Sequence, residues 1–502
     1  MRTRVKIALH PLGKTIAVAA GTSLRSVLHQ YGVEFPCGGH GRCAACRVKL
    51  IDGSLAATAE QAEILSGQEL AQGWRLACRC TAQSDLTLEV GQWEEVILAD
   101  HSTFDFTPAE GLGIAVDLGT TTIVAQLLDR ESGHVLGVRT ALNPQSLYGA
   151  DVMNRIHAVL TDARGGELAR SVRRTIGRLC AQLLRPIPDR SRLRTVVLAG
   201  NTVMHHLFCG LDVTPLSRAP FEPLETGLQV FRPRELRWAI AGDITVCFLP
   251  CIGGFVGSDI LCGLLATQMH QRQSPIILVD LGTNGEIVVG NRQRMLCAST
   301  AAGPAFEGGR IAMGMRATTG AISEVWSEHG GLRCRVIGDG AARGLCGSGV
   351  VDAVAAGLDL GLIEPSGRLA DPAQPLVLAE PVSLTQSDIR QLQLAKAAVA
   401  AGITILRRRF GATASGSLPI YLAGAFGNYV NKRSARRIGL IPAAQDQIEP
   451  AGNTALLGAK MAIFGDPKRN EFSELRSRIE HVPLALDPSF QEIFVNETVF
   501  PG

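Results

Sequence analysis

Five cysteines crowd into a short stretch near the N-terminus, with a spacing that could bind an iron–sulfur cluster. Three of them, Cys37, Cys43 and Cys46, follow a C-x5-C-x2-C pattern in a loop made mostly of glycine and alanine. A [2Fe–2S] cluster needs four thiolates, and its sulfides accept hydrogen bonds from backbone N–H groups that reach them only where side chains are small. The spacing and the composition of the loop therefore both fit a [2Fe–2S] site.

The fourth thiolate must come from a more distant turn, and two cysteines are candidates. Cys78 and Cys80 lie together in the segment R-L-A-C-R-C, and we choose Cys78 with Cys80 as the alternative. Zinc is the competing interpretation, but zinc sites usually pair two short C-x2–4-C knuckles and only one occurs here. The other eight of the 13 cysteines are scattered. We expect them to be buried thiols, since a reducing compartment keeps cysteines free.

The elements expected around these cysteines have the order of a β-grasp ferredoxin. Residues 4–10 and 15–20 alternate like two strands joined by a turn, and a helix should follow at 23–31. A strand, a helix and a closing strand are expected at 47–52, 59–65 and 85–90. The segment resembles the [2Fe–2S] ferredoxins, specifically those with adrenodoxin-like cysteine spacing.

A second kind of polar turn occurs twice in the rest of the chain, each time between two apolar strands. The sequence D-L-G-T stands at 117–120 and again at 280–283, and L-A-G follows at 198–200 and at 422–424. One copy would be weak support, because any buried strand can end in such a turn. Two copies in the same order indicate an internal duplication.

Turns of this kind can hold the phosphates of a nucleotide. Their backbone N–H groups and hydroxyls can point at phosphate oxygens, and an aspartate at the strand end can hold Mg²⁺ through water. Residues 112–465 resemble the actin, hexokinase and heat-shock chaperone superfamily, which implies that ATP and Mg²⁺ bind.

The resemblance also implies which residues form the nucleotide site. The first phosphate motif would be Asp117, Gly119, Thr120, Thr121 and Thr122; the second Asp280, Gly282, Thr283 and Asn284; and the adenosine motif Gly424, Ala425, Phe426 and Gly427. Asp117 and Asp280 would be catalytic. Glu286 is a candidate for orienting the attacking water, and an ordinary strand carboxylate is the alternative.

Length and composition bound the organisation of the chain. At 502 residues, 46% of them hydrophobic, it should form about three structural units. We expect an α+β ferredoxin-like β-grasp domain, then a duplicated α/β actin-like (ribonuclease-H-like) ATPase domain. The proposed parts are a ferredoxin domain at 1–95, a linker at 96–111, halves at 112–270 and 271–465, and a C-terminal extension at 466–502.

Charge and hydropathy exclude some partners. The formal net charge of +3 gives no electrostatic reason to bind nucleic acid or a membrane surface. No apolar run reaches the roughly 18 residues that a membrane span needs, and the N-terminus has no signal-peptide core. We therefore expect a cytoplasmic protein.

A [2Fe–2S] domain followed by an actin-like ATPase resembles the reductive activators of corrinoid proteins. Several segments carry this resemblance: S-T-A-A-G-P-A-F-E-G-G at 299–309, G-L-C-G-S-G at 344–349, A-G-A-F-G-N-Y at 423–429, I-G-L-I-P at 438–442 and G-N-T-A-L-L-G at 452–458. One departure is that activators of this kind have additional residues between the two domains, whereas this chain has a short linker.

The resemblance implies a function and its partners. The chain would use ATP to move an electron from its cluster to the cob(II)alamin of a corrinoid protein, which serves a cobalamin-dependent methyltransferase system. The chain has no D-x-H-x-x-G cobalamin-binding motif, so the partner would carry the corrinoid. An upstream electron donor is implied, and a homodimer is a candidate assembly. The alternatives are another low-potential acceptor, such as a dehydratase, or an actin-like module that senses redox state.

Overall fold

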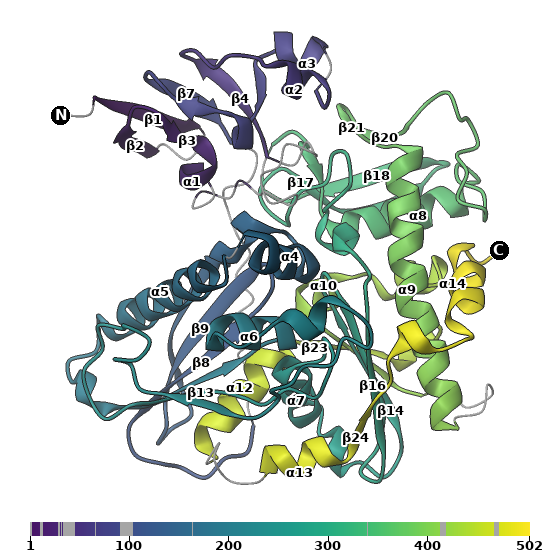
Figure 1. The fold of residues 1–502 in the computed structure, drawn as a ribbon. Coiled ribbons are helices and arrows are strands. Elements are labelled where there is room, and N and C mark those ends of the chain that lie inside the picture. Colours follow the sequence, from purple (N-terminus) through teal and green to yellow (C-terminus); the bar gives the residue numbers. More distant parts are fainter. Residues whose placement is uncertain are drawn as a thin grey trace.

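The computed structural model describes residues 3–10, 14–28, 31, 33, 46–65, 67–90, 104–162, 164–338, 340–411, 418–465 and 471–502. They form a small N-terminal domain and two larger α/β halves. Figure 1 shows the N-terminal domain above, the first half at the lower left and the second half at the right.

The N-terminal domain is built on a five-stranded sheet in the order β2-β1-β7-β4-β5. Its strands are β1 (Arg4–His10), β2 (Lys14–Ala19), β4 (Arg47–Asp52), β5 (Trp74–Leu76) and β7 (Leu86–Glu89). A two-stranded sheet of β3 (Thr22–Ser23) and β6 (Thr81–Ala82) and the short helices α1 (Leu24–Leu28), α2 (Ala59–Ala62) and α3 (Gly67–Ala71) complete it. The expected strands are confirmed, and α2 is shorter than expected. Residues 29 and 30 of the helix expected at 23–31 lie outside the described residues.

Both larger halves contain a six-stranded sheet in which five strands follow the same plan, and the sixth strand, β12 or β24, lies at opposite edges. The orders are β10-β9-β8-β11-β13-β12 and β24-β16-β15-β14-β22-β23. In each half, three consecutive strands pair antiparallel and the next two join in parallel. Because β8 and β14 hold equivalent places and each precedes a D-L-G-T turn, the internal duplication is confirmed.

The elements of the first half are β8 (Leu112–Leu118), β9 (Thr122–Asp129), β10 (Val135–Leu142), β11 (Leu193–Ala199), β12 (Gln229–Phe231), β13 (Thr245–Phe248), α4 (Val152–Asp162), α5 (Gly165–Leu184), α6 (Thr202–Cys209) and α7 (Ser258–Ala266). Those of the second half are β14 (Ile276–Leu281), β15 (Gly285–Gly290), β16 (Met295–Thr300), β22 (Ile420–Ala423), β23 (Ile448–Gly452), β24 (Ile479–His481), α8 (Gly347–Asp359), α9 (Gln386–Phe410), α10 (Gly424–Tyr429), α11 (Lys432–Arg437), α12 (Thr454–Phe464), α13 (Glu471–Ser477) and α14 (Phe490–Thr498). A smaller layer of the second half contains β17 (Ala321–Glu328), β18 (Gly331–Val336), β19 (Gly344–Leu345), β20 (Leu376–Ala379) and β21 (Val382–Leu384).

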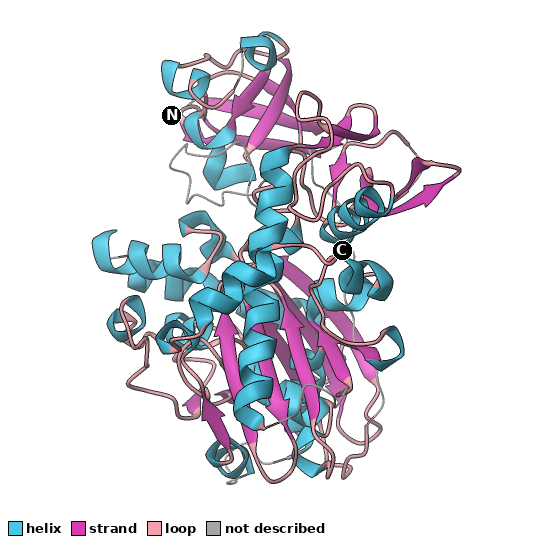
Figure 2. Ribbon diagram, turned by 90° about the vertical axis from the view of Figure 1, so that its right-hand side faces the viewer, coloured by secondary structure: helices cyan, strands magenta, loops and turns pink. Residues whose placement is uncertain are grey.

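Two helices, α7 and α12, join the halves. They approach so closely that a Cβ on Gly458 would lie 2.4 Å from the Cβ of Cys262. On the other side of α12, a Cβ on Gly113 of β8 would lie 2.4 Å from the side chain of Ile463. Buried apolar residues of both halves form one cluster around these helices. Figure 2 shows helices lying over the strands of the large sheets, with the N-terminal domain at the top.

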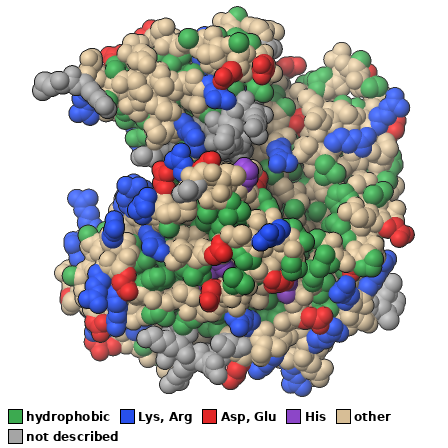
Figure 3. Space-filling model, in the orientation of Figure 1, with side chains coloured by type: hydrophobic (Ala, Val, Ile, Leu, Met, Phe, Trp, Pro, Cys, Tyr) green, Lys and Arg blue, Asp and Glu red, His purple; other side chains and the backbone are tan. Residues whose placement is uncertain are grey.

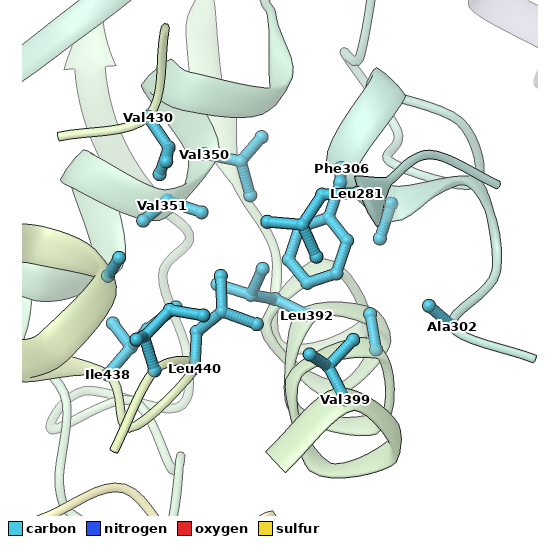
Figure 4. Packing of buried hydrophobic residues seen from close by; sticks show 14 of the residues in the cluster. Leu281, Ala302, Phe306, Val350, Val351, Leu392, Val399, Val430, Ile438 and Leu440 are labelled. Carbon is cyan, nitrogen blue, oxygen red and sulfur yellow. The ribbon is translucent and has the colours of Figure 1, made fainter. Parts of the chain in front are cut away.

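The second half has its own core, which positions one wall of the site. Leu281 and Phe306 pack with Leu392 and Val399 of α9, as Figure 4 shows. The C-terminal segment belongs to this half, because β24 pairs with β16 and α14 packs against α9. α9 is long and apolar enough to cross a membrane, but 78% of its apolar 18-residue stretch is buried inside the protein, as in a core helix.

Candidate functional site

The cysteine site lies where β4 begins. Cys46 directly precedes β4, and Cys78 lies in the 3-10 turn η2 (Ala77–Arg79). Their sulfurs are 3.3 Å apart, and the N–H of Ala77 donates to the carbonyl of Cys46 at 2.9 Å. Two thiolates so close repel each other unless a cation lies between them. The pair is therefore suited to bind one iron. Cys37 and Cys43 lie outside the described residues.

Cys80 has different surroundings. It is buried, its sulfur accepts a long hydrogen bond of 3.9 Å from Gln61, and burial raises the pKa of its thiol to about 11. Gln61 is itself fully buried, and its Oε1 accepts the N–H of Leu76 at 2.9 Å. Gln61 thus fixes the turn that carries Cys78. The geometry favours Cys78 over Cys80 as the fourth ligand.

The two D-L-G-T turns border one cavity of about 340 Å³. The residues predicted for the nucleotide that line it are Asp117, Gly119, Thr120, Thr121, Thr122, Asp280, Gly282, Thr283, Asn284, Glu286, Gly424 and Phe426. Gly427 is not among the lining residues and lies against Leu422 of β22. The side chain of Ala425 is outside the described part of the chain. The fold therefore brings most of the predicted residues of both halves to one cavity.

Local hydrogen bonds hold the first turn in place. The N–H of Gly119 donates to the carbonyl of Thr122 at 3.1 Å, and the amide of Asn201 donates to Thr120 Oγ1 at 3.0 Å. Arg155, which is fully buried, donates to the carbonyls of Thr120 at 2.5 Å and of Gly149 at 2.9 Å. The second turn closes in the same way, with the N–H of Gly282 on the carbonyl of Asn284 at 3.0 Å. Both turns are preorganised, as phosphate binding requires.

Carboxylates from three elements gather in this cavity. Burial raises the pKa of Asp117 to about 6, although Asn453 donates to its Oδ2 at 2.9 Å and opposes the shift. Burial and the charge of Asp117 raise the pKa of Asp280 to about 7. Asp259 of α7 has its pKa raised by burial and then by Asp280. The cavity thus holds carboxyls whose negative charges oppose one another.

Glu286 lies deepest of the predicted acidic residues. It is 6% exposed, and burial, followed by the charges of Asp259 and Asp280, raises its pKa well above the usual range. The hydroxyl of Ser299 lies 3.5 Å from its Oε1. Glu286 therefore holds its proton more tightly than an ordinary carboxyl does, and its water-orienting role stays a prediction.

Three further residues line the cavity and were not predicted from the sequence. Asp259 follows no recognisable motif and reaches the cavity because α7 lies between the two sheets. Asn453 caps α12 and binds Asp117 from the other half. Glu307 accepts hydrogen bonds from Thr121 Oγ1 at 3.3 Å and from Thr283 Oγ1 at 3.0 Å. Asn453 and Glu307 lie in two of the segments that resemble the family, 452–458 and 299–309, but nothing in the sequence showed which residues they contact.

The wall expected to receive adenosine combines a glycine turn with an aromatic stack. Gly424 has φ +83°, and a Cβ there would lie 2.4 Å from Asp280 Oδ1, so only glycine fits. The rings of Phe306 and Phe426 stack with centroids 4.9 Å apart. Gly347 passes under Phe306, where a Cβ would lie 1.7 Å from its carbonyl oxygen. Backbone and rings can therefore approach a flat ligand closely.

Within the described residues, no group of three or more His, Cys, Asp or Glu side chains stands close enough to hold a metal ion directly. The adjacent His205 and His206 are buried in α6, and burial lowers the pKa of His205 to about 3. They are residues of the helix core.

The fold and the site define a class of protein, a ferredoxin domain joined to a duplicated ATP-binding domain of the actin and hexokinase type. Known families match the same division. The family described as "2Fe-2S iron-sulfur cluster binding domain" matches residues 7–83, "RACo middle region" matches 112–272, and "C-terminal domain of RACo the ASKHA domain" matches 274–502. The fold class expected from the sequence is confirmed.

The chain belongs to the RACo family of corrinoid activation enzymes. It is 34% identical over 442 residues to the "Corrinoid activation enzyme RamQ" of Eubacterium limosum, covering 81% of this chain and 74% of that protein. It is 27% identical to the "[Co(II) methylated amine-specific corrinoid protein] reductase" of Methanosarcina barkeri, covering 77% and 76%. A solved "Reductive activator for corrinoid,iron-sulfur protein" superposes with a TM-score of 0.71 at 26% identity, covering 99% and 98%. The family expected from the sequence is confirmed.

Proposed function

We propose that this protein is an ATP-dependent reductive activator, which transfers one electron from a [2Fe–2S] cluster to the cob(II)alamin of a corrinoid protein. When bound, the cluster would give up the one electron that reduces Co(II) to Co(I), the state that accepts a methyl group. The observation that carries the proposal is the contact of a ferredoxin domain, with its close cysteine pair, against both halves of an ATP-binding fold.

The residues proposed for the cluster are Cys37, Cys43, Cys46 and Cys78. Of these, Cys46 and Cys78 have sulfurs 3.3 Å apart, which suits two ligands of one iron. When bound, the cluster supplies a single electron at low potential. The buried Gln61 holds the turn of Cys78 in place, and Cys46 is 1% exposed, so this part of the site excludes water.

The residues proposed for ATP are those of the two phosphate turns and the wall at Gly424 and Phe426. The fit to Mg²⁺ rests on the carboxyls of the cavity, because buried aspartates with raised pKa values favour a divalent cation that neutralises them. Asp117, Asp280 and Asp259 would hold the cation through water. Mg²⁺ itself would offset the charge of the phosphates.

ATP is needed because the electron moves uphill. For one electron about 59 mV corresponds to 1.4 kcal/mol, so a gap of about 300 mV would cost about 7 kcal/mol, within the reach of ATP hydrolysis. We further propose an upstream electron donor, a cytoplasmic location and a homodimer as the assembly to be tested.

The test follows the absorbance of cob(II)alamin in a purified corrinoid protein, mixed anaerobically with the reduced full-length chain. Conversion to Co(I) that requires Mg-ATP is the expected result. Asp117→Ala serves as the matched control, because it should keep the cluster spectrum and lose the ATP effect. A loaded cluster with a cognate partner and no effect of ATP would refute the proposal and point to another electron acceptor.

A further inference from the structure

The ferredoxin domain rests on both halves of the ATP-binding fold. On the first half, Leu147 packs against the ferredoxin core, and the guanidinium of Arg25 lies 5.9 Å from the ring centre of Tyr148. Both residues of the first half belong to the 3-10 turn η3 (Pro144–Tyr148). Figure 3 shows a hollow at the left edge between the ferredoxin domain and the first half, so contact is limited on this side.

Contacts with the second half involve a residue next to a cluster cysteine. Arg47, which follows Cys46 directly, donates to the carbonyl of Ala312 at 3.3 Å. Glu89 at the end of β7 forms an ion pair with Arg343. The position of the ferredoxin domain therefore depends on two surfaces that belong to different halves.

Glu307 links the same two halves inside the nucleotide cavity. It belongs to the second half, and its Oε2 accepts hydrogen bonds from Thr283 of its own half and Thr121 of the first. These hydroxyls belong to the two phosphate turns. A carboxylate oxygen thus occupies the place between the turns where a phosphate oxygen would accept the same two hydrogen bonds.

A terminal phosphate and Glu307 cannot both keep these hydroxyls. Each hydroxyl has one proton to donate, and two anions at one point in a water-poor cavity repel each other strongly. A phosphate that reaches the turns therefore displaces the carboxylate and breaks its hydrogen bond across the halves.

Glu307 and Thr121, the two partners of the hydrogen bond between the halves, are each linked through a few residues to a contact with the ferredoxin domain. Glu307 precedes Ala312 by five positions. On the other side, the carbonyl of Thr121 accepts the N–H of Asn143 at 2.8 Å, and Asn143 caps η3. A shift at the carboxylate is thus passed to both surfaces that hold the ferredoxin domain.

We propose that Glu307 is the positioning residue that couples ATP to the cluster domain: the terminal phosphate displaces its carboxylate from Thr121 and Thr283, and the ferredoxin domain is released from its contacts at Ala312 and η3. This inference rests on the proposed function, because it requires ATP in the cavity. Release exposes the side of the domain where Cys46 and Arg47 lie to an electron acceptor.

Hydrogen exchange of the full-length protein with its cluster tests the proposal, read at 46–52 and 144–148 without nucleotide, with Mg-ADP and with a non-hydrolysable Mg-ATP analogue. The wild type should exchange faster at both segments with the ATP analogue than with ADP or without nucleotide. Glu307→Ala should exchange fast in all three states and still bind the analogue. Glu307→Gln, which keeps the shape and removes the charge, should bind the analogue more tightly than the wild type. Glu328→Ala, at an exposed ion pair with Arg333, is the matched control and should behave like the wild type.

The outcomes distinguish a failure of the proposed function from a failure of the coupling through Glu307. A wild type that binds no ATP analogue would overturn the proposed function. A wild type that binds the analogue without any change at the two segments would overturn the coupling. If Glu307→Ala kept the nucleotide-dependent change, or lost analogue binding, Glu307 would not be the coupling residue.

Discussion

Replacing a charged residue of the nucleotide cavity should stabilise the nucleotide-free protein at high pH. The residue is Asp280, whose pKa is raised to about 7 by burial and by the charge of Asp117. In the unfolded chain an aspartate titrates near about 3.9. Between these values the folded protein binds more protons than the unfolded chain. The free energy of unfolding therefore falls as the pH rises from about 4 to 7, and the loss is complete above that range.

The size of the stability difference follows from the shift in the pKa of Asp280. Three pKa units correspond to about 4 kcal/mol. Because Asp280 lines a cavity that water can enter, screening reduces this value, and we take about half, or about 2 kcal/mol. Asp280→Asn imitates the protonated carboxyl and carries no charge at any pH. At about pH 8 the variant should therefore be about 2 kcal/mol more stable than the wild type, a rise of roughly 2 °C in Tm for an ATP-binding unit of this size.

Thermal unfolding in the presence of a chelator, between about pH 5 and pH 8, measures this difference. The exposed Asp446→Asn is the control and should follow the wild type. Added Mg²⁺ should raise the Tm of the wild type at high pH more than that of Asp280→Asn, since the cation neutralises the same repulsion. Equal loss of stability with pH in the wild type and in Asp280→Asn would refute the reasoning.

Three further predictions concern other parts of the molecule. Cys78→Ser should abolish the visible absorption of the cluster while Cys80→Ser keeps it, and the reverse result would make Cys80 the ligand. Asp117→Ala should lose ATP hydrolysis, measured as phosphate release, and keep the cluster spectrum; normal hydrolysis would remove Asp117 from the site. Gly458→Ala should lower the stability by about 2 kcal/mol through overpacking against α7, read by denaturant unfolding, whereas Gly67→Ala, with no atom within 4 Å of its Cβ, should change little.

The sequence alone identified the parts whose chemistry is local. The cysteine spacing and the small residues around it indicate a cluster because ligands and backbone N–H groups come from one loop. The two D-L-G-T turns indicate phosphate binding for the same reason, since each turn carries its own glycine and hydroxyls. Repetition of the turns in one order was enough to predict the duplication, which the matching strand orders confirm.

Only the tertiary structure showed which distant residues meet. Asp259, Asn453 and Glu307 reach the cavity because α7, α12 and the turn after β16 converge between the two halves, and no local pattern encodes such contacts. The sequence already favoured Cys78 as the fourth ligand with Cys80 as the alternative, and the structure adds the distances that support this preference. The two are neighbours in sequence, but only Cys78 lies beside Cys46, while the other is buried against Gln61. Spacing along the chain determines ligand type and turn chemistry, whereas distances between side chains depend on how the sheets and helices pack.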